Sequence, residues 1–111
     1  MGGEYNYLAI LFGLSGKVAV VTGGGGVLCG AMSLALGRVG VKVGVLDLIL
    51  EAAQKVVDEV IATDGAAIAV QCDVLDKASV GAAGRAVIER FGRVDILING
   101  AGGNKKQATT S

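Results

Sequence analysis

The sequence contains no histidine and no proline, and only two cysteines, Cys29 and Cys72, occur among its 111 residues. Without histidine, neither a Ser-His-Asp triad nor a Cys-His pair can form within this chain. Two cysteines also supply too few of the usual ligands for a zinc site, so we expect no bound metal. In so glycine-rich a chain, they favour reduced thiols in a cytoplasmic protein over a disulfide framework.

Strong charge of one sign and long apolar runs are missing as well. Ten lysines and arginines balance ten aspartates and glutamates, so the formal net charge is zero. We therefore expect no nucleic-acid partner and no acidic membrane surface. The apolar segment 7–14 is too short to span a membrane and lacks a preceding basic stretch, which argues against a signal peptide. Asn6 stands where an N-myristoylation signal needs serine or threonine.

Apolar residues and glycine are abundant instead. Hydrophobic residues make up 52% of the chain, and the mean hydropathy is +0.63. This is apolar for a small free-standing domain and predicts that part of the surface is covered by something else. The length fits one domain. We expect an N-terminal arm at residues 1–16, with Leu8, Ile10 or Phe12 packed onto a body formed by residues 17–111.

From residue 17 onwards, short apolar runs alternate with segments of helical periodicity. We expect strands at 17–21, 42–46, 66–71 and 94–98, and helices at 27–39, at 50–63 and from Asp76 or Ser79 to Phe91. The expected buried residues are Leu28, Ala31, Met32, Ala35, Leu36 and Val39, then Ala53, Val56, Val57, Val60 and Ile61, then Val80, Ala83, Val87 and Phe91. The pattern predicts an α/β fold: a Rossmann-type doubly wound parallel sheet in three α/β/α layers, incomplete at about four strands and three helices.

Four consecutive glycines, Gly23 to Gly26, lie between the first strand and the first helix. A phosphate-binding turn belongs at such a place, because unpaired helix amides and the helix dipole attract an anion there. Asp47 follows Gly26 by 47 − 26 = 21 residues, close to the spacing of about 20 for a carboxylate that holds a ribose diol. The alternatives for Asp47 are a solvated loop acid and a cap for the following helix.

Four segments in order, VTGGGGVLCG, VLD, CDV and DILINGAGGN, resemble the first half of a short-chain dehydrogenase/reductase over residues 17–110. The resemblance implies NAD as cofactor and hydride transfer between its nicotinamide and a secondary alcohol or ketone. It also implies a homo-oligomer, either a dimer or a tetramer. Within the family, GGGGVLCGAM and INGAGGN followed by ATT are similar to fructuronate reductases (D-mannonate oxidoreductases), which adds sugar acids to the candidate substrates.

The resemblance also implies which residues contact the cofactor. Asp73 and Val74 would border the adenine, and the residues after the fourth strand would line the ribose and nicotinamide. The alternatives are a helix-capping acid for Asp73 and a residue that fixes the strand end for Asn99. Lys105 and Lys106 would meet a substrate carboxylate or remain a solvated pair. The full expected set is Gly23, Gly25, Gly26, Val27, Leu28, Asp47, Leu48, Asp73, Val74, Asn99, Gly100, Ala101 and Gly102.

Three residues depart from the family pattern. Val27 and Cys29 stand at its second and third glycines, and Gly100 stands at its second asparagine. Cys29 is small enough to let the helix and strand approach each other. The alternative is a reactive thiolate at a helix N-terminus.

No catalytic residue is expected within this chain. The family's Tyr-x-x-x-Lys pair is missing, since Tyr5 and Tyr7 precede the first strand and are followed four residues later by Ala9 and Leu11. The sequence therefore predicts a cofactor-binding half whose chemistry comes from elsewhere. The alternatives are a non-catalytic NAD-binding or regulatory module and a methyltransferase, which Thr22 before the glycines disfavours. Asp47, with no cation beside it in the sequence, favours NAD over NADP.

Overall fold

Strands and helices alternate along the chain in the computed structural model, which describes residues 13–100. Most of the predicted N-terminal arm, including Leu8, Ile10 and Phe12, lies outside these residues. The predicted strands and helices are all present, with ends within two residues of those expected. They are β1 (Val18–Thr22), α2 (Val27–Arg38), β2 (Lys42–Asp47), α3 (Leu50–Ala62), β3 (Ala67–Gln71), α4 (Lys77–Phe91) and β4 (Ile96–Asn99).

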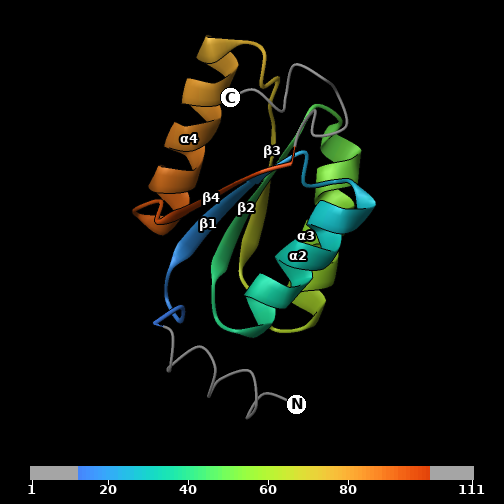
Figure 1. Cartoon of the computed structure of the whole chain (residues 1–111), viewed down its shortest axis with the longest axis vertical. Helices are drawn as coiled ribbons and strands as arrows, with labels where there is room; N and C mark the ends of the chain where they lie inside the picture. The colour runs from blue at the N-terminus through green and yellow to red at the C-terminus, as the bar shows by residue number, and fades with distance from the viewer. Residues whose placement is uncertain (1–12, 101–111) are drawn as a thin grey trace.

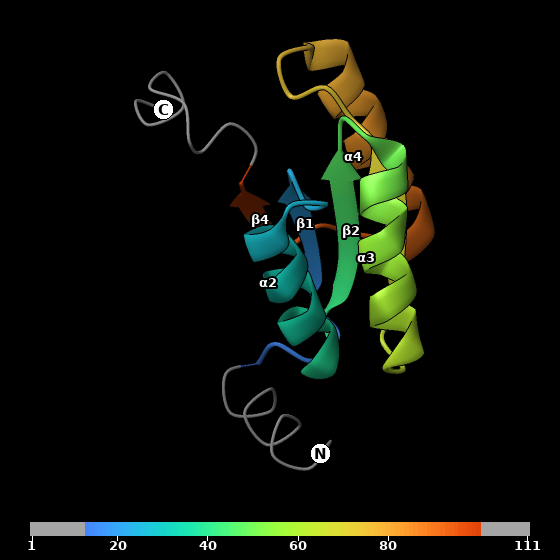
Figure 2. The same cartoon turned by 90° about the vertical axis from the view of Figure 1, so that its right-hand side faces the viewer.

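All strands are parallel, in the order β3-β2-β1-β4. Helices α2 and α3 cover one face of the sheet and α4 covers the other (Figure 1). Seen from the side, α2 and α3 lie next to each other in front of β1 and β2 (Figure 2). The predicted three-layer, doubly wound fold is confirmed. Because the chain leaves β1 for β2 on one side and β4 joins it on the other, the strand order reverses at β1.

Two apolar cores lie on opposite faces of the sheet, since successive strand residues point to opposite sides. Ala19 and Val21 belong to the core under α2 and α3, whereas Val18 and Val20 belong to the core under α4. All five residues of β1 are buried, as expected for a parallel strand covered on both faces. The outer strands are less covered, and Leu97 of β4 is 67% exposed.

The predicted buried faces of α3 and α4 are mostly correct. Ala53, Val56, Val57 and Val60 of α3 are buried, as are Ala83 and Val87 of α4, and Phe91 packs half-buried against the core. Two residues predicted to be buried are exposed instead: Ile61 of α3 is 52% exposed and Val80 of α4 is 43% exposed. Ile61 lies at the C-terminal end of α3 and Val80 in the first turn of α4, so both exposed residues are at helix ends.

The predicted buried face of α2 is only partly correct: Leu36 and Val39 pack half-buried against the core under α2 and α3, and Met32 is half-buried. Leu28 is 74% exposed and Ala31 and Ala35 are also exposed, whereas the buried residues are small: Cys29, Gly30, Ser33 and Gly37. The reason is close packing against α3. A Cβ atom on Gly30 would lie 3.2 Å from Val56 Cγ2, and one on Gly37 would lie 2.9 Å from Val60 Cγ1. A helix that is apolar nearly all round gives no periodicity from which this face could be chosen.

The helix ends follow the expected chemistry. Gly40 and Gly92 have φ values of +89° and +90°, which favour glycine after a helix. Asp76, one of two predicted caps for α4, accepts a hydrogen bond on Oδ1 from the Ala78 N–H at 3.0 Å. The other candidate, Ser79, instead accepts a hydrogen bond on Oγ from the Asp73 N–H at 2.9 Å. Within residues 13–100, no helix has the length and apolar character needed to cross a membrane.

Candidate functional site

The carboxyl ends of the four strands bring the described candidate residues to one edge of the sheet. The glycine turn follows β1, Asp47 ends β2, Asp73 follows β3, and Asn99 ends β4. The strand register keeps these ends level, with Thr22 opposite both Leu46 and Asn99. Ala101, Gly102, Lys105 and Lys106 lie outside the described residues.

The glycine turn leads directly into α2. Gly23 has a φ of +65°, in the region that favours glycine, and its carbonyl accepts a hydrogen bond from the Gly26 N–H at 3.1 Å. Gly26 is the N-cap of α2 and offers no side chain, so no side chain caps the helix. The first amides of α2 have no partner within the helix and point out of its N-terminus. An anion could bind at this end of α2.

Two of the four glycines are required by packing against the protein itself. A Cβ atom on Gly24 would lie 2.6 Å from Val45 Cγ1, and one on Gly25 would lie 2.6 Å from Ala52 Cβ. By contrast, a Cβ atom on Gly26 would meet only the Gly23 carbonyl oxygen, at 3.4 Å. Neither Gly24 nor Gly25 has a positive φ, so lack of space, not backbone conformation, excludes a side chain there.

Asp47 connects the glycine turn to the start of α3. Its Oδ2 accepts a hydrogen bond from the Gly25 N–H at 2.9 Å, and its Oδ1 accepts one from the Ile49 N–H at 2.9 Å. The acceptor bond from Ile49 shapes the turn before α3; no side chain caps that helix, so the helix-capping alternative raised from the sequence is wrong. The side chain is half-buried. A carboxylate has about four lone-pair sites, so Asp47 retains the capacity to accept hydrogen bonds from ligand hydroxyls.

Asn99 and Thr22 join the ends of β1 and β4. The Thr22 hydroxyl donates a hydrogen bond to Asn99 Oδ1 at 2.8 Å, and the Gly100 N–H donates one to the Thr22 carbonyl oxygen at 3.1 Å. Asn99 therefore fixes the strand end, which is the alternative role considered from the sequence. The part played by the Thr22 side chain was missed. In the sequence, the one sign of this contact is that a hydroxyl residue ends one predicted strand and an amide residue ends another. The two strands become neighbours only in the folded sheet.

The departures at Cys29 and Gly100 meet in space. A Cβ atom on Gly100 would overlap Cys29 Sγ and would lie 3.0 Å from the Thr22 carbonyl oxygen. Cys29 is 9% exposed, and both Cys29 and Cys72 are free, buried thiols. This environment fits the packing role predicted for Cys29.

The segment after β3 presents an acidic turn beside apolar side chains. Asp73 Oδ1 accepts a hydrogen bond from the Leu75 N–H at 3.0 Å, so Asp73 shapes its own turn and does not cap α4. Gln71 Nε2 donates a hydrogen bond to the Leu48 carbonyl oxygen at 3.1 Å, which ties this edge of the sheet to the segment after β2. Leu48 and Val74 are 61% and 38% exposed, and offer apolar surface to a flat ring.

A groove of about 500 Å³ between α2 and α3 also reaches the glycine turn. Gly25 and Gly26 line it together with small residues of both helices, and Lys55 and Glu59 of α3 lie along it. Lys55 was not predicted from the sequence, because it is adjacent to neither Asp47 nor the turn along the chain. Helical spacing from Ala52, which lies against Gly25, would have found it.

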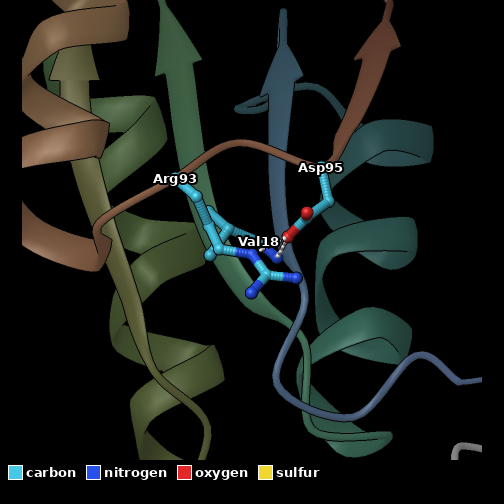
Figure 3. Close-up of polar contacts among 3 residues, drawn as sticks. All are labelled: Val18, Arg93 and Asp95. Atoms are coloured by element: carbon cyan, nitrogen blue, oxygen red, sulfur yellow. Dashed lines mark hydrogen bonds and ion pairs between the residues drawn. The ribbon is translucent and has the colours of Figure 1, made fainter.

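At the opposite, amino-terminal end of the strands, Asp95 joins β1 to the segment before β4 (Figure 3). Its Oδ2 accepts hydrogen bonds from the Val18 N–H at 2.9 Å and from Arg93 Nε at 2.8 Å. The hydrogen bond from the Arg93 guanidinium, followed by that from Val18, lowers the pKa of Asp95 below its usual value. This ion pair lies at the other end of the strands from the candidate site, and its bond to Val18 links the start of β1 to the segment before β4.

Known proteins resemble this chain in both sequence and fold. A family model described as short chain dehydrogenase matches residues 17–111. The uncharacterized oxidoreductase UxuB of Bacillus subtilis is 52% identical over 97 residues, which cover 87% of this chain and 35% of that protein.

Two solved structures carry the same fold. A protein of Haemophilus influenza with the provisional name D-mannonate oxidoreductase, solved with bound NAD, superposes with a TM-score of 0.79 and 39% identity over 86% of this chain and 34% of its own. A hydroxysteroid dehydrogenase of Escherichia coli gives 0.76 and 36% over 81% of this chain and 39% of its own. The chain thus spans roughly a third of the length of the proteins it matches.

Proposed function

Because the chain belongs to the short-chain dehydrogenase family, we propose that it forms the cofactor-binding portion of an NAD-dependent oxidoreductase. One observation carries this proposal: a glycine turn, a helix N-terminus and the Asp47 carboxylate meet at the carboxyl edge of a parallel sheet. Ligands of open α/β sheets bind outside this edge, where the strand order reverses.

The described residues fit a dinucleotide at several points. The first-turn amides of α2 would hold the diphosphate, and Asp47 would accept hydrogen bonds from the adenosine ribose. Leu48 and Val74 offer apolar surface for the adenine. Asn99 and Gly100 would line the nicotinamide side, with Ala101 and Gly102 continuing it. When bound, the nicotinamide supplies the hydride chemistry, and the protein residues bind and orient it.

Asp47 is also the basis for proposing NAD rather than NADP. A carboxylate at the ribose repels a 2′-phosphate, and the three residues that follow Asp47 are apolar. Among residues 13–100, Lys55 is the one cation that lines the groove beside the turn, and Glu59 shares that groove with it. The charge of Glu59 opposes that of Lys55 and reduces the attraction of this groove for a 2′-phosphate.

The reaction proposed for the full protein is hydride transfer to or from a secondary alcohol or ketone, with a sugar acid as the preferred candidate. The sugar acid is supported by the likeness to the NAD-bound protein named as a D-mannonate oxidoreductase. The described residues offer no general acid at the strand ends besides carboxylates. We propose that a serine and a Tyr-x-x-x-Lys pair outside this segment supply the proton transfer.

We further propose that other elements cover β4 in the full protein, which would be a cytoplasmic homo-oligomer. The exposed Leu97 and the open edge of β4 support additional strands and a helix at this side. The buried free thiols support a reducing compartment.

Titration calorimetry of the full protein with NAD and with NADP tests the proposal. We expect NAD to bind at least about tenfold more tightly, a difference of roughly 1.4 kcal/mol. Absence of dinucleotide binding would refute the proposed function, and tighter NADP binding would refute the cofactor choice. NAD binding without turnover of any alcohol, ketone or sugar acid would favour the non-catalytic module instead.

A further inference from the structure

Position 100 leaves no room for a side chain because the Cys29 side chain lies next to it. Gly100 is absent from the glycines with positive φ among the described residues, so its backbone conformation suits other residue types. A Cβ atom there would overlap Cys29 Sγ, yet it would lie 3.7 Å from Cys29 Cβ, an ordinary van der Waals distance. The sulfur atom of Cys29 is therefore the main obstacle to a side chain at position 100.

The two residues connect the two sides of the candidate site. Cys29 lies in the first turn of α2, whose N-terminus faces the expected diphosphate. Gly100 directly follows β4, and its N–H donates to the Thr22 carbonyl oxygen at the end of β1. The contact between them thus spans the point where the strand order reverses, and it determines how far the start of α2 stands from the end of β4.

We propose that Cys29 and Gly100 form a compensating pair of positioning residues: the thiol fills the volume that a side chain at position 100 would need. The two departures from the family pattern, a cysteine in place of glycine and a glycine in place of asparagine, are then one coupled change. The role in cofactor binding rests on the proposed function, whereas the packing role does not.

A double-mutant cycle of Cys29→Ala and Gly100→Ala in the full chain tests this proposal. Gly100→Ala alone forces α2 and β4 apart, and we expect NAD affinity to fall roughly tenfold with a lower unfolding midpoint. Cys29→Ala alone removes only the sulfur, so NAD affinity should stay within about threefold of the parent. The double variant should regain most of the lost affinity and midpoint. Its remaining contact is the one at 3.0 Å to the Thr22 carbonyl oxygen, which needs a shift of a few tenths of an ångström.

Gly84→Ala is the matched control, because a Cβ atom on Gly84 of α4 would meet no atom within 4 Å. It should leave NAD affinity unchanged. The proposal is refuted if the two substitutions change NAD affinity and the unfolding midpoint additively. It is also refuted if the double variant binds NAD no more tightly, and is no more stable, than Gly100→Ala. If Gly100→Ala fails to fold, a folded double variant supports the proposal and an unfolded one refutes it. If the parent does not bind NAD, the proposed function fails, but coupling between the unfolding midpoints still decides whether the pair exists.

Discussion

Replacing Asp47 by alanine should weaken both the fold and the choice of cofactor, because the same carboxylate serves both. The substitution removes the acceptors for the Gly25 and Ile49 amides, each now 2.9 Å from a carboxylate oxygen. Hydrogen bonds to charged groups contribute about 1.5–3 kcal/mol each. Since Asp47 is half-buried, water can replace part of both bonds, and we expect a loss of about 2 kcal/mol in the free energy of unfolding.

Loss of the ribose contact should weaken NAD binding by about 1.5–3 kcal/mol, which is roughly ten- to 150-fold. NADP should lose less, because the repulsion of its 2′-phosphate disappears together with the contact. The ratio of NAD to NADP affinity should therefore fall. Asp47→Asn keeps one acceptor without the charge, so it should recover part of the stability but not the preference for NAD.

Urea unfolding and calorimetric titration with both cofactors measure these effects. Asp58→Ala is the matched control: it removes the same charge from α3, where the hydrogen bond that Asp58 accepts within residues 13–100 is an exposed one from Gln54. Its effect should stay within about 0.5 kcal/mol. The reasoning fails if Asp47→Ala is as stable as Asp58→Ala, or if it keeps the full preference for NAD. The second result would direct attention to Lys55 and Glu59 in the neighbouring groove.

Two further predictions concern the turn and the opposite end of the sheet. Gly25→Ala should lower the free energy of unfolding by about 1–3 kcal/mol, because its Cβ would lie 2.6 Å from Ala52 Cβ, whereas Gly26→Ala should leave it nearly unchanged. Equal costs in urea unfolding would contradict this. Asp95→Asn should reduce stability near neutral pH. The pKa of Asp95 is lowered in the folded state by Arg93, so its charge contributes stability above the ordinary aspartate pKa, and this contribution is lost as the pH falls through the lowered pKa. Unfolding curves of parent and variant should thus converge in acid, and a pH-independent difference would exclude the ion pair as the cause.

The sequence predicted the sheet and the order of its elements because the information was local. Apolar runs such as Val18–Thr22, glycines after helices and an acid at Asp76 each specify a strand, an end or a start without reference to distant residues. The buried face of α2 could not be predicted in this way. Its leucines and alanines surround the helix, and only the close approach of α3 selects the side with Gly30 and Gly37.

The same distinction applies to the candidate site. Sequence spacing indicated that Asp47 lies near the glycine turn, and the hydrogen bond to Gly25 shows that they are in contact. It could not reveal that the carboxylate is already bonded to two backbone amides, since these bonds depend on how the turn packs against α3. The pairing of Cys29 with Gly100 joins residues far apart in the chain and likewise appears only in the fold.

Ligand binding alone does not explain the run of glycines, because two of them are required by packing within the protein. Glycines beside a phosphate are usually attributed to the approach of the ligand, yet Gly24 and Gly25 lack space because Val45 and Ala52 already occupy it. The turn is therefore packed against β2 and α3 before any cofactor arrives. A turn held in this way loses little conformational freedom when a diphosphate binds, and preorganisation of this kind favours affinity. It follows that substitutions at Gly24 or Gly25 should damage stability and binding together, whereas Gly26 is the position where a defect in binding alone would reveal contact with the ligand.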